Sequence, residues 1–209
     1  MWQSHGEYTD KNKRLLCRFA PRNDGVLLVK FLNRSKTMKY LLLFLTFLTF
    51  NVMSADKIII NIEQQKLYLY QQDKLVKSYV ISSSKYGTGQ VAGSNKTPLG
   101  LHKIAKKFGN KATIGTIFKA RANTGRIAKI LTDKTKSKAD NVTTRIMWLQ
   151  GLERKNKNSY LRYIYIHGTD EEGFIGTPAS HGCIRMKNTE VMELFNAVRV
   201  GVLVNIVEH

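Results

Sequence analysis

From residue 56 onward, short runs of alternating or β-branched apolar residues dominate the chain, which is typical of β-strands. The four residues 71–74 predict a hairpin turn between two such runs, residues 82–96 are rich in serine and glycine and predict a loop, and Thr97-Pro98-Leu99-Gly100 introduces another strand. The predicted strands cover residues 58–62, 66–70, 75–81, 101–105, 143–149, 162–167 and 202–207.

One segment has the period of an amphipathic helix instead. Asn188 or Thr189 can cap it, and Gly201 follows its end. Four apolar residues fall at i, i+3, i+4 and i+7 and predict one buried face: Val191, Leu194, Phe195 and Val198. The sequence contains no repeats and no second domain. The pattern therefore predicts a mostly-β single domain with one or two short helices.

Residues 106–141 are basic, with scattered glycines and no sustained hydrophobic period. A long irregular stretch in a compact domain is often a functional loop or lid. A mobile insertion without a function of its own explains the same pattern, and the two interpretations remain open.

The N-terminal part differs in character. Residues 38–55 have a short positive start, an apolar centre and small residues at the end, as a secretory signal does. The apolar run is shorter than the roughly 20 residues that span a membrane. We interpret residues 1–37 as an extension added by the gene model and residues 56–209 as the exported domain. The alternative is an uncleaved anchor with a cytoplasmic tail, and N-terminal sequencing of the exported protein distinguishes the two.

Basic residues outnumber acidic ones along the whole chain, with a formal net charge of +19. Residues 1–55 hold nine of the 34 Lys and Arg and three of the 15 Asp and Glu, which leaves 25 and 12, or +13, in the remainder. An exported domain with this charge is expected to be attracted to anionic cell-envelope polymers. Nucleic acid is the competing partner, but no RNA-binding or zinc-finger signature supports it.

The chain has two cysteines, and removal of the signal would also remove Cys17, leaving Cys183. A thiol with the ordinary pKa of about 8.5 is weakly ionised at neutral pH, so a nucleophilic role requires a nearby base or positive charge. His167 ends the apolar run 163–166, which predicts a buried strand and a rigidly held imidazole. The glycines and the proline within residues 168–179 suit a loop that folds back toward it.

Neighbouring residues suggest supporting roles. Gly182 lets the backbone approach a substrate closely, and N–H groups around Cys183 could form an oxyanion hole. Arg185 keeps its charge at any ordinary pH; it could bind a carboxylate, support the thiolate, or bond loop carbonyls in a structural role. A zinc site of His167, His181 and Cys183 is an alternative, but it lacks an obvious fourth ligand, and we predict no metal. A buried structural thiol is disfavoured by the polar, glycine-containing surroundings.

These motifs together resemble the L,D-transpeptidase catalytic domain, also called the YkuD domain. The resemblance rests on Tyr163-Ile-Tyr-Ile-His167-Gly168-Thr169 followed by Ser180-His181-Gly182-Cys183-Ile184-Arg185-Met186. Residues 93–100, residues 144–146, the opening strands and the closing helix and strand extend it over about residues 57–207.

The resemblance implies a β-sandwich-like fold, a periplasmic or cell-envelope location and a thiol mechanism without a cofactor. It implies that Cys183 attacks a tetrapeptide stem of peptidoglycan and expels the terminal D-alanine. His167 would transfer the proton, and the carbonyl of Gly168 would orient its imidazole. Ser180 and His181 would shape the substrate pocket, together with Gly182 and Arg185.

The acceptor remains open. An amine acceptor gives a transpeptidase, commonly with a meso-diaminopimelate side chain, whereas water gives a carboxypeptidase or a murein-peptide hydrolase. A non-catalytic, basic murein-binding module is the alternative from another class, and the His167–Cys183 pair argues against it. Contact with the membrane is expected only through the export signal.

Overall fold

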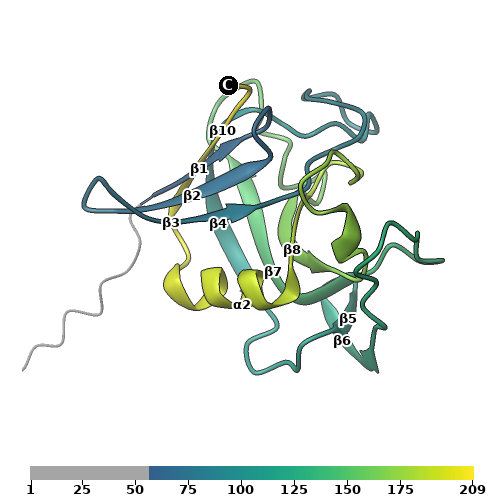
Figure 1. Ribbon diagram of the computed structural model, residues 1–209. Helices are drawn as coiled ribbons and strands as arrows, with labels where there is room; N and C mark the ends of the chain where they lie inside the picture. Colours follow the sequence, from purple (N-terminus) through teal and green to yellow (C-terminus); the bar gives the residue numbers. More distant parts are fainter. Residues whose placement is uncertain (1–56) are drawn as a thin grey trace, which may run out of the picture. The chain divides into compact units, whose positions relative to one another are not determined.

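The computed structural model describes residues 57–209, which fold into ten strands, one α-helix and one 3-10 helix (Figure 1). The predicted extension, 1–37, and the predicted signal, 38–55, lie outside the described residues. In chain order the elements are β1 (Lys57–Asn61), β2 (Lys66–Gln71), β3 (Lys74–Val80), β4 (Gly100–Phe108), β5 (Thr116–Lys119), β6 (Ala122–Ile127), β7 (Val142–Gly151), β8 (Tyr165–Thr169), the 3-10 helix η1 (Glu172–Phe174), β9 (Ile184–Met186), α2 (Asn188–Ala197) and β10 (Leu203–Val207).

All ten strands belong to one hydrogen-bonded sheet that branches at β7. Its main path runs β3-β2-β1-β10-β4-β7-β5-β6. Strands β4 and β5 pair with successive parts of one edge of β7, while β8 pairs along the other edge and carries β9 in parallel. The prediction of a mostly-β domain with one or two short helices is confirmed.

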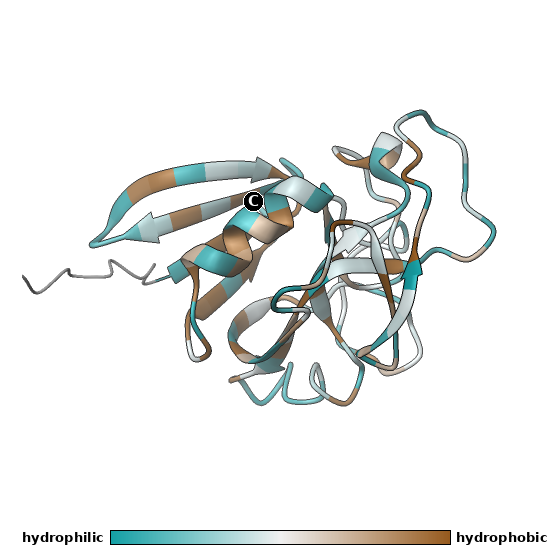
Figure 2. Cartoon of the chain, turned by 90° about the horizontal axis from the view of Figure 1, so that it is seen from below, coloured by the Kyte–Doolittle hydropathy of each residue, from teal (hydrophilic) through white to brown (hydrophobic). Residues whose placement is uncertain are grey.

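The apolar core lies between the sheet and α2, which packs against β7 and β8 (Figure 1). All four residues of the predicted helical face are buried, so this prediction is confirmed. Figure 2 shows the hydrophobic stripe of α2 and the alternation along the strands. Ile166 of β8 lies opposite Ile184 of β9, and both are core residues. Because side chains alternate along a strand, His167 and Arg185 face away from this core, on the side where the site is built.

Residues 106–141 are more regular than their sequence predicts. Strand β4 continues to Phe108, and β5 and β6 form a hairpin. Its turn residues Ala120 and Arg121 both have left-handed φ angles, 48° and 69°, as the two-residue turns that match strand twist require. The expectation of one irregular stretch is therefore wrong for residues 106–108 and 116–127. Five of the six β6 residues are exposed, so the strand leaves no alternating apolar signal.

Two local predictions are also wrong. Asn188 is the first residue of α2 and makes no capping bond; the N-cap position belongs to Lys187, which has no side-chain cap bond either. The buried Asn188 side chain instead joins β7 to β8, accepting a hydrogen bond from Thr143 Oγ1 (2.6 Å) and donating one to the Thr169 carbonyl (2.7 Å). Tyr163 does not begin a buried strand: it is 52% exposed with φ of 58°, and β8 starts two residues later.

Candidate active site

Cys183 stands at the end of a turn that leads directly into β9. Its Sγ accepts a hydrogen bond from the backbone N–H of Tyr165 and donates one to the carbonyl of Tyr163, both at 3.4 Å. The thiol is free, and the residue is partly exposed. Backbone groups just before and at the start of β8 therefore hold the sulfur in place.

Hydrogen bonds within and beside the turn fix its shape. Ser180 Oγ donates to the carbonyl of Cys183 (2.6 Å) and accepts from the N–H of Gly182 (3.2 Å). Thr97 Oγ1 donates to the carbonyl of Gly182 at 3.1 Å. Gly182 has φ of 118°, which favours glycine at this position. Ser180 is 1% exposed, so in this structure it stabilises the turn rather than lining the substrate surface.

His167 lies in β8 opposite Arg185 of β9, and Cys183 immediately precedes β9. Its Nδ1 is 2.7 Å from the carbonyl oxygen of Gly168. A carbonyl can only accept, so Nδ1 carries the hydrogen and Nε2 of the neutral ring keeps a lone pair for a proton. A Cβ on Gly168 would lie 2.6 Å from Asn188 Oδ1 and 2.8 Å from the Thr143 carbonyl. There is thus no room for a side chain at the position that orients the imidazole.

Burial keeps both partners neutral at rest. Loss of solvation raises the pKa of the Cys183 thiol to about 11, although the Tyr165 N–H and the charge of Arg185 act in the opposite direction. Loss of solvation also lowers the pKa of His167 to about 4, against the hydrogen bond to Gly168. These pKa shifts favour a thiol and a neutral imidazole at pH 7.

This resting state predicts the pH dependence of thiol alkylation. The thiolate fraction grows about tenfold per pH unit below the pKa, so the rate of Cys183 modification by iodoacetamide should rise steadily from pH 7 to 9 without a plateau. A short cysteine peptide, with its ordinary pKa, provides the control and should level off near pH 9. Mass spectrometry of quenched samples measures both rates. A plateau for Cys183 at or below pH 7 would indicate a preformed thiolate and contradict this assignment.

Arg185 is 2% exposed and bound by two carboxylates of the protein itself. Its Nη1 is 3.0 Å from Glu171 Oε2, and its Nη2 is 2.5 Å from Asp140 Oδ2. Glu171 also accepts a hydrogen bond from the N–H of Ser137 (2.7 Å). Arg185 therefore anchors the loop 128–141 beside residues 180–183. A contact between Arg185 and a substrate carboxylate stays a prediction.

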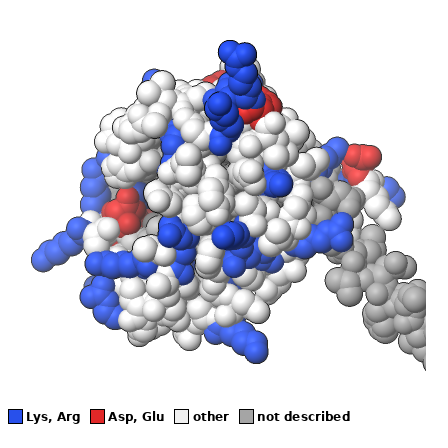
Figure 3. Space-filling view, turned by 180° about the vertical axis from the view of Figure 1, so that it is seen from behind, with Lys and Arg blue, Asp and Glu red and all other residues white. Residues whose placement is uncertain are grey.

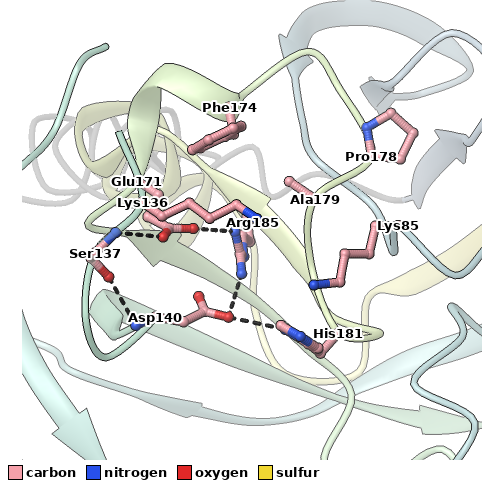
Figure 4. A pocket seen from close by; sticks show the side chains of 10 residues that line it. All are labelled: Lys85, Lys136, Ser137, Asp140, Glu171, Phe174, Pro178, Ala179, His181 and Arg185. Carbon is pink, nitrogen blue, oxygen red and sulfur yellow. Dashed lines mark hydrogen bonds and ion pairs between the residues drawn. The ribbon is translucent and has the colours of Figure 1, made fainter. Parts of the chain in front are cut away.

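His181 faces a different partner from the thiol. Its Nδ1 is 3.1 Å from Asp140 Oδ2, and its ring lies 5.7 Å from that of Tyr86, centroid to centroid. The side chain is 46% exposed and lines a pocket next to Arg185 (Figure 4). These contacts suit the predicted pocket role of His181.

The predicted residues thus fall into two groups. His167 and Gly168 lie in β8, which pairs with the strand that directly follows Cys183, whereas His181 and Arg185 meet at Asp140. The sequence did not reveal the groups that support them, chiefly the carboxylates of Asp140 and Glu171 and the backbone N–H of Tyr165. Thr97 belongs to the Thr97-Pro98-Leu99-Gly100 motif, but nothing in the sequence links it to the carbonyl of Gly182, 85 residues away.

Within residues 57–209, no group of three or more His, Cys, Asp or Glu side chains is arranged to hold a metal ion. His167, His181 and Cys183, the residues of the zinc alternative, do not form such a group in this part of the chain.

Comparison with known proteins gives a consistent picture. The family model described as "L,D-transpeptidase catalytic domain", YkuD, matches residues 55–206. The protein named "Probable L,D-transpeptidase YcfS" of Escherichia coli strain K12 is 29% identical over 159 residues, which are 73% of this chain and 44% of that protein. The chain spans less than half the length of the curated relatives it matches.

Solved structures that match this chain include L,D-transpeptidase 3 from Mycobacterium tuberculosis in complex with a faropenem-derived adduct, with 16% identity and a TM-score of 0.47. That match covers 74% of this chain and 60% of the other. The L,D-transpeptidase of Xylanimonas cellulosilytica has 17% identity and a TM-score of 0.45, over 74% of this chain and 61% of the other.

Proposed function

Because this chain belongs to the L,D-transpeptidase catalytic domain family, we propose that it is a peptidoglycan L,D-transpeptidase acting through an acyl-enzyme on Cys183. The observation that carries the proposal is the pairing of β8 with β9. It supports the proposal because His167 lies opposite Arg185, two residues after Cys183. The Tyr165 N–H is bonded to the thiol, and Nδ1 of the imidazole is bonded to the Gly168 carbonyl.

In the first half-reaction, Cys183 Sγ attacks the carbonyl carbon that precedes the terminal D-alanine of a tetrapeptide stem. The thiol proton moves to His167 Nε2, and the carbonyl oxygen becomes an oxyanion. When the tetrahedral intermediate collapses, the C–N bond breaks and the proton passes from His167 to the departing D-alanine amine. A thioester remains on Cys183. In the second half-reaction, an amine attacks the thioester, His167 takes its proton and returns it to sulfur, and a new amide forms.

The oxyanion needs donors near the thiol. The N–H of Gly182 already donates to Ser180 Oγ, so it is not free in this structure. The N–H of Tyr165 donates to Sγ, so it stabilises the negative charge that develops on sulfur while the proton leaves, and not the oxyanion. This backbone bond needs no side chain.

We propose His167 as the general base, and His167→Ala should therefore lower turnover of tetrapeptide muropeptides by at least about 10³-fold. His181→Ala is the matched control, since it removes a histidine that is bound to Asp140 rather than placed beside the thiol. We expect it to retain turnover within about tenfold of the unmodified protein. Chromatography of the products measures turnover. Equal losses of turnover in the two variants would show that His167 is not the general base.

Product analysis with purified muropeptides tests the function itself and identifies the acceptor. Cross-linked dimers indicate an amine acceptor, and tripeptides without dimers indicate water. If neither product forms while the domain is folded, the proposed activity is wrong. A non-catalytic murein-binding module would instead retain the muropeptides unchanged.

The proposed location is the cell envelope, with residues 38–55 as the export signal. No helix among the described residues is long and apolar enough to cross a membrane. Lys and Arg side chains spread over the face seen in Figure 3, whereas Asp and Glu show at its edges. A surface of this charge suits attraction to anionic envelope polymers.

A further inference from the structure

A pocket of about 300 Å³ lies beside residues 180–183, the segment that ends at Cys183 (Figure 4). Its volume is at the small end of the range for ligand sites. Phe174, Pro178 and Ala179 form its apolar wall, while Lys85 and Lys136 enter from opposite sides. Neither Cys183 nor His167 is among its lining residues.

The pocket is nevertheless close to the reacting groups. His181 and Arg185, two residues to either side of Cys183, both line it. The charges of Arg185 and Asp140, another lining residue, influence the pKa values of both Cys183 and His167. A peptide bound with a carbonyl at the thiol would therefore have its neighbouring groups within reach of the pocket.

The cationic side chains that line the pocket differ in whether they form ion pairs with carboxylates of the protein. Arg185 is committed to Asp140 and Glu171. Lys85 Nζ lies 5.1 Å from the centre of the Tyr86 ring, and across residues 57–209 neither Lys85 nor Lys136 has a carboxylate within ion-pair distance. The ammonium groups of Lys85 and Lys136 therefore both line the pocket without an ion pair to a carboxylate of residues 57–209, and the apolar wall lies next to them.

The position of Lys136 is fixed by its neighbours. Ser137, the next residue, donates its N–H to Glu171 Oε1, and Asp140 binds both Arg185 and His181. The basic loop 128–141 is thereby fastened at two points beside the pocket, and the loop that sequence analysis left unassigned supplies one of the two ammonium groups.

We propose that this pocket binds a carboxylate of the acyl-donor peptide, with Lys85 and Lys136 as its cationic contacts and Phe174 and Pro178 against the aliphatic part of the same residue. The inference rests on the proposed function and deepens it, because it names a specificity determinant for the donor. A peptide stem offers its terminal D-alanine carboxylate and carboxylates farther along the chain, and the chemistry of recognition is the same for each.

The test compares Lys85→Gln and Lys136→Gln with Lys134→Gln, an exposed lysine of the same loop that does not line the pocket. We expect each pocket variant to raise KM for the acidic tetrapeptide about tenfold, with kcat changed less than twofold. Lys134→Gln should leave both constants unchanged. Equal KM shifts in all three variants would mean a diffuse charge effect, and unchanged KM in the pocket variants would also overturn the proposal.

Amidated donors identify the carboxylate. One peptide carries a carboxamide in place of the terminal carboxylate, and a second carries carboxamides at the internal positions. The peptide that lacks the bound carboxylate should have a raised KM in the unmodified protein and no further response to Lys85→Gln or Lys136→Gln. If both amidated peptides respond as strongly as the acidic one, the pocket does not bind a carboxylate.

Equilibrium binding separates this inference from the proposed function. In the Cys183→Ala protein, calorimetric titration measures the affinity for the acidic and the amidated tetrapeptides in the absence of turnover. Tighter binding of an acidic peptide, lost in Lys85→Gln/Lys136→Gln, supports the pocket even if no product forms with the unmodified protein. Equal affinities for acidic and amidated peptides would contradict it even if turnover is observed.

Discussion

Replacing Cys183 with alanine is expected to lower turnover of tetrapeptide muropeptides by at least about 10⁴-fold while the domain stays folded. The thiol is the only group in the proposed mechanism that bonds to the substrate, so its loss leaves no route to the acyl-enzyme. The sulfur makes two long hydrogen bonds, both 3.4 Å, and the residue is partly exposed. Its removal should therefore cost about 1 kcal/mol or less in the free energy of unfolding.

Cys183→Ser is the matched control for shape. A hydroxyl fits the same position, but it is a far weaker acid than a thiol and lacks sulfur's nucleophilicity, so this variant should be inactive too. A carbapenem provides a second readout: the unmodified protein should gain the mass of one inhibitor on Cys183, and neither variant should. Full activity of Cys183→Ala on muropeptides would show that another residue is the nucleophile.

Replacing Arg185 with methionine is expected to lower the free energy of unfolding by about 3–5 kcal/mol, because it leaves a buried carboxylate without its partner. The effect comes mainly from Glu171, whose side chain is 8% exposed. Asp140 is 35% exposed, and water can compensate part of its loss. Chemical denaturation measures the change, and trypsin should cut the lysine-rich loop 128–141 faster once its anchor is gone.

A compensating variant shows whether the unpaired charges are the cause. Adding Asp140→Asn and Glu171→Gln to Arg185→Met should recover much of the lost stability, since replacing a whole buried ionic group is often nearly neutral. Arg154→Met removes an exposed arginine and should stay within about 0.5 kcal/mol of the unmodified protein. If Arg185→Met is as mild as Arg154→Met, the Arg185 ion pairs do not hold this part of the fold together.

The strands and the helix were predictable where one face is buried and the other is not. The face of α2 formed by Val191, Leu194 and Phe195 shows in the sequence because burial selects the 3.6-residue period. The β5–β6 hairpin carries no such signal, because its outer strand is exposed on both faces. Its left-handed turn residues, Ala120 and Arg121, are not the glycine or asparagine that usually mark this turn.

The reacting groups of the site were easier to find than their supports. Cys183 and His167 could be predicted because their types, their motif and the apolar strand before His167 point to thiol chemistry. The partners of Arg185 could not, because Asp140 and Glu171 lie 45 and 14 residues away and reach it only after β8 and β9 pair. Asn188 was mistaken for a cap because its residue type suits both a helix start and a buried polar hub.

The intact mass of the protein during turnover tests the central proposal most directly. With excess tetrapeptide donor and no amine acceptor, a rapidly quenched sample should contain a heavier form of the protein. The added mass should equal the mass of the donor peptide minus the mass of one molecule of free D-alanine, and it should lie on Cys183. The same sample of Cys183→Ala should keep its original mass. D-alanine release without any adduct on Cys183, or an adduct that persists in Cys183→Ala, would contradict the proposed mechanism.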